Sequence, residues 1–130
     1  MKKIKELLAI LLLPLCTSAE VLNCKVEQVS RLYENGTLGK HYSGFLQRDS
    51  DKHFSVNTVS GEISGMILDN TRPGFCFVKV SGGGDDDTNI ISNCGGGSID
   101  IIKISTWDKN KPFVAVDWIR SVYSGTCSKS

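Results

Sequence analysis

The stretch IDIIKIST, residues 99–106, decides the fold, because β-branched side chains dominate it and such side chains favour strands. Successive side chains of a strand point to opposite faces, so every second residue of the stretch shares a face. The alternation is imperfect, since isoleucines occupy both faces. We expect Ile102 and Ile104 to face the core and Asp100 to lie at the strand's edge in solvent.

The rest of the chain also has the sequence pattern of short strands separated by polar turns. No long stretch has the 3.6-residue period of a helix, and Gly, Asn, Asp and Ser recur about every ten residues. The Asn35-Gly36 pair predicts a tight turn, because both residues tolerate positive φ. Further strands are expected at residues 22–29, 42–46, 53–59, 62–68, 75–80, 113–118 and 121–127. Seven or eight short strands predict an all-β domain, a single small antiparallel β-barrel or β-sandwich.

Residues 81–98 differ in composition from the rest of the chain. Glycine triplets at 82–84 and 95–97 enclose the acidic triplet 85–87. Such a stretch has little apolar surface to bury, so we expect one long surface loop in which only Ile90 and Ile91 touch the body. The aspartates lack the order of a calcium-binding loop, and we interpret them as solvated. No metal or cofactor is expected.

The N-terminal residues 1–19 have the pattern of a secretory signal peptide. Three lysines precede an apolar run at residues 7–15, and the small residues 17–19 form a cleavage site. The run is shorter than the roughly 20 residues that span a bilayer. We therefore expect a single domain at residues 20–130 without a transmembrane segment, in the bacterial periplasm or secreted. Lipidation at Cys16 is the alternative, disfavoured because Leu15 stands where a small residue is expected.

The charge of the chain argues against two classes of partner. The formal charge of the full chain is +1, and removing three lysines and Glu6 with the leader lowers it by two, to −1. Nucleic-acid and anionic-membrane binders need a basic face. A nearly neutral domain is therefore not expected to bind nucleic acid or an anionic membrane.

Four cysteines remain after cleavage, and an oxidising compartment would pair them. Four cysteines allow three pairings, and sequence alone does not select one. We favour a nested pattern, in which Cys24 joins Cys127 because the first and last strands of a closed meander often meet. Cys76 would then join Cys94 at the base of the glycine-rich stretch.

Several motifs resemble those of a group of small, uncharacterised, exported proteins of Gram-negative bacteria. They are the early Cys24, FSVNTVSGEISG at 54–65, KPFV at 111–114 and VYSGTC at 122–127. The resemblance implies a periplasmic β-domain and a bond between Cys24 and Cys127, and it implies no activity. The segment from Cys76 to Cys94 departs from the shared pattern.

A few side chains are candidates for function. Trp107, Trp118, Arg120 and Tyr123 form a possible binding surface, because Trp, Tyr and Arg dominate protein interfaces. Core packing with an exposed edge is the competing interpretation. The two histidines, His41 and His53, are the best candidates for a Ser-His-Asp site assembled by folding, although no nucleophile elbow is present.

These features predict an exported envelope protein that acts as a protein-binding or inhibitory module of the immunity type. Its partner would be another envelope or secreted protein, recognised by loops on a rigid disulfide-bonded scaffold. The alternative is a carrier that holds a small ligand inside a barrel. An interior filled by Phe54, Val56, Ile102 and Ile104 would argue against that alternative. A hydrolase or a secreted effector ranks below both, and an enzyme is not the expected class.

Overall fold

The computed structural model describes residues 20–40, 46–65, 67–72 and 74–130. The predicted signal peptide, His41 and nearly all of the strand predicted at 42–46 lie outside these ranges. The described chain is all-β, which confirms the predicted fold class. None of its helices is long and apolar enough to cross a membrane.

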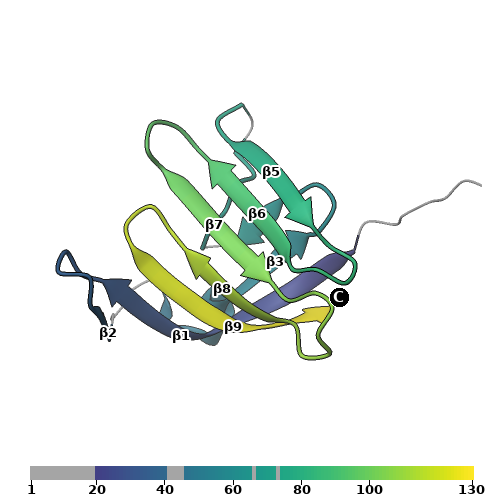
Figure 1. The fold of residues 1–130 in the computed structure, drawn as a ribbon, viewed down its shortest axis with the longest axis horizontal. Helices are drawn as coiled ribbons and strands as arrows, with labels where there is room; N and C mark the ends of the chain where they lie inside the picture. The colour runs from purple at the N-terminus through teal and green to yellow at the C-terminus, as the bar shows by residue number, and fades with distance from the viewer. Residues whose placement is uncertain (1–19, 41–45, 66, 73) are drawn as a thin grey trace, which may run out of the picture.

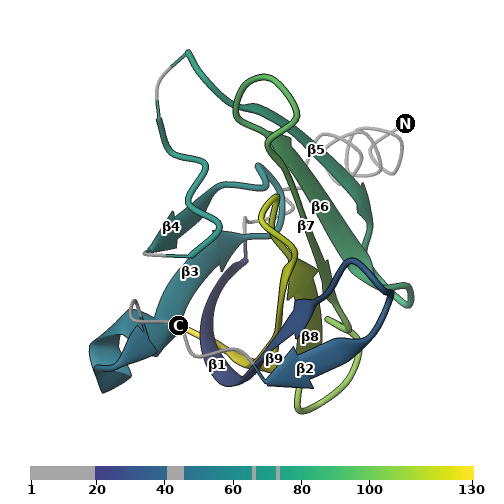
Figure 2. The same cartoon turned by 90° about the vertical axis from the view of Figure 1, so that its left-hand side faces the viewer.

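One antiparallel sheet makes up the fold, and its strands follow the order β4-β3-β1-β9-β8-β7-β6-β5, with β2 attached to β1. The sheet curls into a half-barrel (Figure 1), and Figure 2 shows this curl from the side. A short 3-10 helix, η2 (Asp49–Lys52), precedes β3. The strands are β1 (Val21–Leu32), β2 (Leu38–Lys40), β3 (His53–Asn57), β4 (Ile63–Gly65), β5 (Phe77–Gly82), β6 (Thr88–Asn93), β7 (Ile99–Ile104), β8 (Pro112–Val116) and β9 (Ser121–Lys129).

The first and last strands of the domain pair along most of their length, and Cys24 lies directly opposite Cys127. These two cysteines form a disulfide bond. A second disulfide bond joins Cys76, directly before β5, to Cys94, directly after β6. The favoured nested pattern is therefore confirmed. Each bond links neighbouring antiparallel strands, so both fix the register of the sheet.

A β-bulge in β1 changes which of its side chains face the core. Before the bulge Leu22, Cys24 and Val26 are buried, as alternation predicts. The register with β9 shifts between Val26 and Gln28. An extra residue in one strand turns the following side chains to the other face, so Gln28 is exposed although uninterrupted alternation would place it on the inner face.

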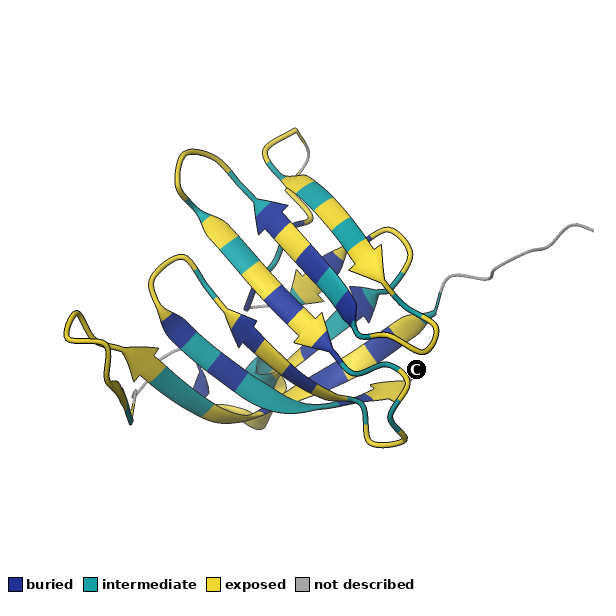
Figure 3. Ribbon diagram, in the orientation of Figure 1, coloured by how far each residue is buried: buried dark blue, intermediate teal, exposed yellow. Residues whose placement is uncertain are grey.

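The buried side chains form one core cluster. Figure 3 shows that buried positions alternate with exposed ones along the strands. The Phe54 and Phe113 rings meet edge to face, with centroids 5.2 Å apart. Ile102 and Ile104 are buried as predicted, whereas Ile99 and Ile101 on the opposite face of β7 are each 45% exposed. The core comprises Leu22, Cys24, Val26, Leu46, Phe54, Val56, Ile63, Ile67, Leu68, Ile90, Ile102, Ile104, Phe113, Ala115, Tyr123 and Cys127.

The prediction of one long loop at residues 81–98 is wrong. Within it β6 pairs with β5 on one side and with β7 on the other, and Ile90 is fully buried. Thr88 and Ser92 share the inward face with Ile90, and these small polar residues hid the strand pattern. The glycines lie largely in the turns on either side, where Gly83, Gly84, Gly95 and Gly96 have positive φ.

A buried asparagine, Asn70, connects the start of β4 to β6. The Asn70 Oδ1 atom accepts a hydrogen bond from the Ile63 amide at 2.6 Å. Its Nδ2 group donates to the Gly61 carbonyl at 2.8 Å and to the Ser92 hydroxyl of β6 at 2.9 Å. Because Gly61 and Ile63 flank the start of β4 and Ser92 belongs to β6, Asn70 ties the two sides of the half-barrel together across its open side.

Candidate functional site

The turn between β8 and β9 presents apolar side chains to solvent. Residues 117–120, here called the recognition turn, have the sequence Asp-Trp-Ile-Arg. Trp118 is 62% exposed and Ile119 is 44% exposed. Polar residues suit such turns better, so two large exposed apolar side chains at its tip suggest a binding role.

The Asp117 side chain fixes the backbone of the recognition turn. Its Oδ1 atom accepts hydrogen bonds from the Ile119 amide at 3.1 Å and from the Ser121 amide at 2.8 Å. The backbone closes the same turn, because the Arg120 amide donates to the Asp117 carbonyl and the Asp117 amide to the Ser121 carbonyl. Side-chain and backbone hydrogen bonds therefore fix the conformation of this turn.

Asp100, at the start of β7, supports the same turn from the neighbouring strand. Its Oδ1 atom accepts a hydrogen bond from the Trp118 amide at 3.0 Å. The expectation that Asp100 lies in solvent is wrong, because the turn folds over it and leaves it half-buried. Burial raises the pKa of Asp100; the Trp118 amide opposes this rise, and the nearby charge of Asp117 adds to it.

Tyr123 lies beneath the turn and is only 6% exposed. Its hydroxyl donates to Asp117 Oδ2 at 2.7 Å. Burial raises the pKa of Tyr123, and the hydrogen bond to Asp117 raises it further. Tyr123 therefore positions the turn and does not belong to its exposed surface, which corrects part of the predicted binding surface.

Arg120 has a backbone φ of 69°, in the left-handed region. This conformation costs a non-glycine residue about 1–2 kcal/mol, and glycine would avoid that cost. Backbone strain of this kind often marks functional sites. The Arg120 side chain is exposed, and no described carboxylate forms an ion pair with it.

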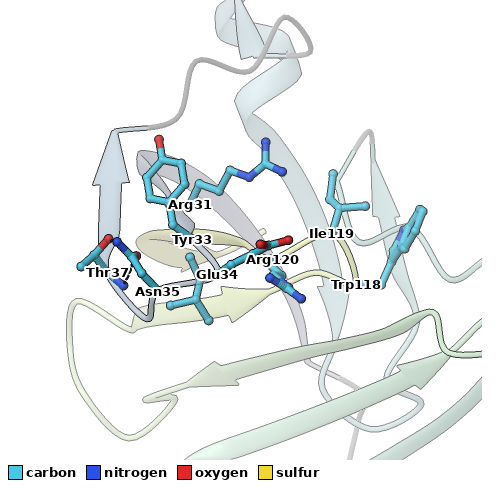
Figure 4. A pocket seen from close by; sticks show the side chains of 9 residues that line it. Arg31, Tyr33, Glu34, Asn35, Thr37, Trp118, Ile119 and Arg120 are labelled. Carbon is cyan, nitrogen blue, oxygen red and sulfur yellow. Dashed lines mark hydrogen bonds between the residues drawn. The ribbon is translucent and has the colours of Figure 1, made fainter.

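An open groove of about 880 Å³ lies between the recognition turn and the β1–β2 hairpin (Figure 4). The amide of Leu32 donates to the carbonyl of Arg120 at 3.0 Å, which holds the hairpin against the turn. The groove therefore has two walls that are distant in sequence and close in space. Its lining comprises Arg31, Leu32, Tyr33, Glu34, Asn35, Thr37, Trp118, Ile119 and Arg120.

The β1–β2 hairpin, which forms one wall of the groove, was not predicted from sequence as part of a binding surface. The Asn35-Gly36 turn was predicted correctly, and Gly36 has a φ of 83°. The pairing of β1 with β9 then brings this hairpin beside the recognition turn. That pairing was implied by the Cys24–Cys127 bond, so the bond was the one signal that could have located the second wall.

Trp107 does not belong to this groove. It lies in the loop between β7 and β8, at the opposite end of these strands from the recognition turn. Its Nε1 group donates to Asp87 Oδ1 at 2.7 Å, and this hydrogen bond lowers the pKa of Asp87. The predicted binding surface thus divides: Trp118 and Arg120 lie together, Tyr123 supports them, and Trp107 is remote.

His53, on β3, lines a second hollow of about 600 Å³. His53 Nε2 lies 3.4 Å from Asp49 Oδ2, and the other oxygen of Asp49 lies 3.3 Å from Lys25 Nζ. Serines line this hollow, but none in the described ranges is hydrogen-bonded to His53. The described residues therefore do not assemble a Ser-His-Asp site here, and they contain no cluster of three or more possible metal ligands.

Comparisons of the chain with protein-family models, with curated proteins and with solved structures find no match. The resemblance to exported proteins of Gram-negative bacteria stays a prediction, and the geometry of the recognition turn carries the functional argument.

Proposed function

We propose that this protein is an exported binding module, of the inhibitory or immunity type, that recognises another protein through the recognition turn and the neighbouring groove. One observation carries the proposal: Trp118, Ile119 and Arg120 project from a turn whose backbone is held by Asp117 and Asp100. Trp and Arg are among the residues that contribute most to binding energy at protein interfaces.

The rigidity of the turn supports this function. Binding costs free energy when flexible groups must be ordered, and a preformed loop avoids much of that cost. The strained φ of Arg120 fits the same account, since the chain bears a conformational cost that places an arginine beside Trp118. Tyr33 and Arg31, on the opposite wall, extend the surface with two more side chains that are common at interfaces.

The interior of the half-barrel gives less support to the small-ligand carrier. Phe54, Val56, Ile102 and Ile104 are each 4% exposed or less and occupy the space that a ligand would need. Export is proposed from the N-terminal leader, and two disulfides among the described residues agree with an oxidising compartment.

The proposal can be tested by site-specific photo-crosslinking in cells that naturally produce the full chain. A benzoylphenylalanine replaces Ile119 in one variant and Val114 in the other. Both positions are 44% exposed, and Val114 faces outward on β8, away from the groove. The pair therefore controls for accessibility.

We expect the Ile119 variant to form a discrete adduct with one other protein, identified by mass spectrometry, and the Val114 variant to form none. Adding Arg120→Gln to the Ile119 variant should reduce the yield of this adduct. Equal adduct patterns at the two positions, or no adduct at either, would contradict the proposed function.

A further inference from the structure

The β4 and β5 edges, at the two ends of the main strand order, differ in how their backbone groups are bonded. At the β4 edge, the Ile63 amide donates to Asn70 Oδ1 and the Gly65 amide to Asp69 Oδ2 at 3.1 Å. The Asn70 amide in turn donates to the Ile63 carbonyl at 3.0 Å. The chain therefore caps its own β4 edge, which is a common way to prevent further pairing.

The β5 edge has no such cap among the described residues. β5 is the terminal strand of the sheet (Figure 1), and β6 is its one described strand partner. The Gly83 amide bonds the Asp87 carbonyl across the β5–β6 turn. Backbone bonding alternates along antiparallel pairs, so Phe77, Lys79 and Ser81 bond β6. The N–H and C=O groups of Val78 and Val80 consequently point away from the sheet.

The side chains of β5 also favour pairing along this edge. Val78 and Val80 pack against the core, so the inner face of the strand is held in place. Phe77 points outward and is 84% exposed. Up to Ser81, before the positive φ of Gly82, β5 has free backbone groups and an exposed aromatic side chain. Such a strand is a template for another strand.

We propose that a second copy of this chain adds to this edge, with the two β5 strands antiparallel and Val80 opposite Val80 of the other copy. The β4 edge is capped, and a two-fold pairing of β5 with β5 uses the β5 edge of both copies. Pairing of identical edges about a two-fold axis then closes after two copies and does not continue into a fibre.

The register follows from charge and from strand length. A two-fold axis at Lys79 would place two like charges directly opposite each other, which is destabilising. An axis at Val78 would pair half of the strand, residues 80–82, with residues 74–76, which precede β5. An axis at Val80 keeps residues 78–82 of both copies within the strands, and it places Lys79 opposite Ser81 of the other copy.

The glycines that follow β5 fit the same register. Phe77 would lie opposite Gly83 of the other copy. A Cβ atom placed on Gly83 would meet only the Thr88 hydroxyl, at 3.9 Å, so the space beside this glycine is open. The exposed Phe77 ring can therefore lie over the backbone of Gly83 of the other copy. This contact would give Gly83 a role in the dimer. The dimer would carry two recognition turns. The proposal that it forms does not depend on the proposed function.

Sedimentation velocity of the oxidised mature protein, from micromolar to millimolar concentration, tests the proposal. We expect a concentration-dependent species of twice the monomer mass. Val80→Pro removes the outward N–H and leaves the bonds to β6 intact, so it should abolish this species. Val80→Thr is the matched control, because it alters the same side chain and keeps the N–H, and it should still dimerise.

Crosslinking gives a second test that does not depend on how well Val80→Pro folds. Lys79→Cys and Ser81→Cys variants are prepared separately, then mixed and mildly oxidised. The proposed register predicts a disulfide-linked dimer in the mixture and little in either variant alone. A protein that stays monomeric at all concentrations, a dimer that persists in folded Val80→Pro, or efficient linkage of Lys79→Cys to itself would overturn the proposal.

Discussion

Replacing Asn70 with alanine should destabilise the domain more than Ser92→Ala or Tyr123→Phe. Asn70 is 7% exposed and makes three hydrogen bonds, to the Ile63 amide, the Gly61 carbonyl and the Ser92 hydroxyl. The alanine variant leaves all three partner groups without their bond. Ser92 is 1% exposed, so its hydroxyl cannot turn to bulk water.

The size of the effect follows from these three groups. A buried polar group that loses its partner costs about 1–3 kcal/mol. Water entering the space left by the side chain would recover part of this cost. We therefore expect the free energy of unfolding to fall by about 4 kcal/mol, which is a large share of the 5–15 kcal/mol typical of a domain.

Urea unfolding followed by far-UV circular dichroism, with both disulfides intact, measures this change. Asn110→Ala is the matched control, because Asn110 lies on an exposed loop and should change stability by less than about 0.5 kcal/mol. Ser92→Ala should cost about 1 kcal/mol, and its effect should not add to that of Asn70→Ala. A loss below about 1 kcal/mol for Asn70→Ala would refute the view that this side chain holds the half-barrel closed.

Three further changes test the recognition turn. Arg120→Gly should raise the free energy of unfolding by about 0.5–1 kcal/mol, because glycine adopts a φ of 69° without strain; a lower urea midpoint would contradict this. Tyr123→Phe should lower it by about 1–2 kcal/mol through loss of the bond to Asp117, and an unchanged midpoint would count against that bond. Asp100→Asn should stabilise the domain at pH 7, because burial raises the pKa of Asp100 and its charged form therefore disfavours the folded state. This advantage should shrink as the pH falls through the raised pKa and vanish below the ordinary value of about 3.9; a constant difference between pH 3 and pH 7 would exclude this cause.

Much of the fold could be predicted from sequence because alternation and cysteine position are local or pairwise signals. The inward face of β7 and the bond between Cys24 and Cys127 followed from them. β6 was missed because its inward residues include Thr88 and Ser92, whose hydroxyls are bonded by loop residues distant in sequence. Thr88 bonds the Thr106 hydroxyl, and Ser92 bonds Asn70.

The candidate site was predictable only in part. Residue types identified Trp118 and Arg120, but they could not separate these from Trp107, which lies at the other end of the strands. Trp118 lies beside the β1–β2 hairpin because β1 pairs with β9. This placement depends on the order of the strands in the sheet, which residue types do not reveal. The hydrogen bond from the Trp118 amide to Asp100 could not be predicted either, because it depends on β7 and β8 being neighbours.

Two tryptophans of nearly equal exposure permit the most direct test of the central claim, that the recognition turn binds the partner. Trp118 is 62% exposed and Trp107 is 57% exposed, and both lie in loops. The measurement is the affinity of the crosslinked partner for Trp118→Ala and for Trp107→Ala, by calorimetry. We predict a loss of at least about 30-fold for Trp118→Ala, as for a residue that dominates an interface, and less than about 3-fold for Trp107→Ala. Equal losses, or a larger loss for Trp107→Ala, would contradict the account.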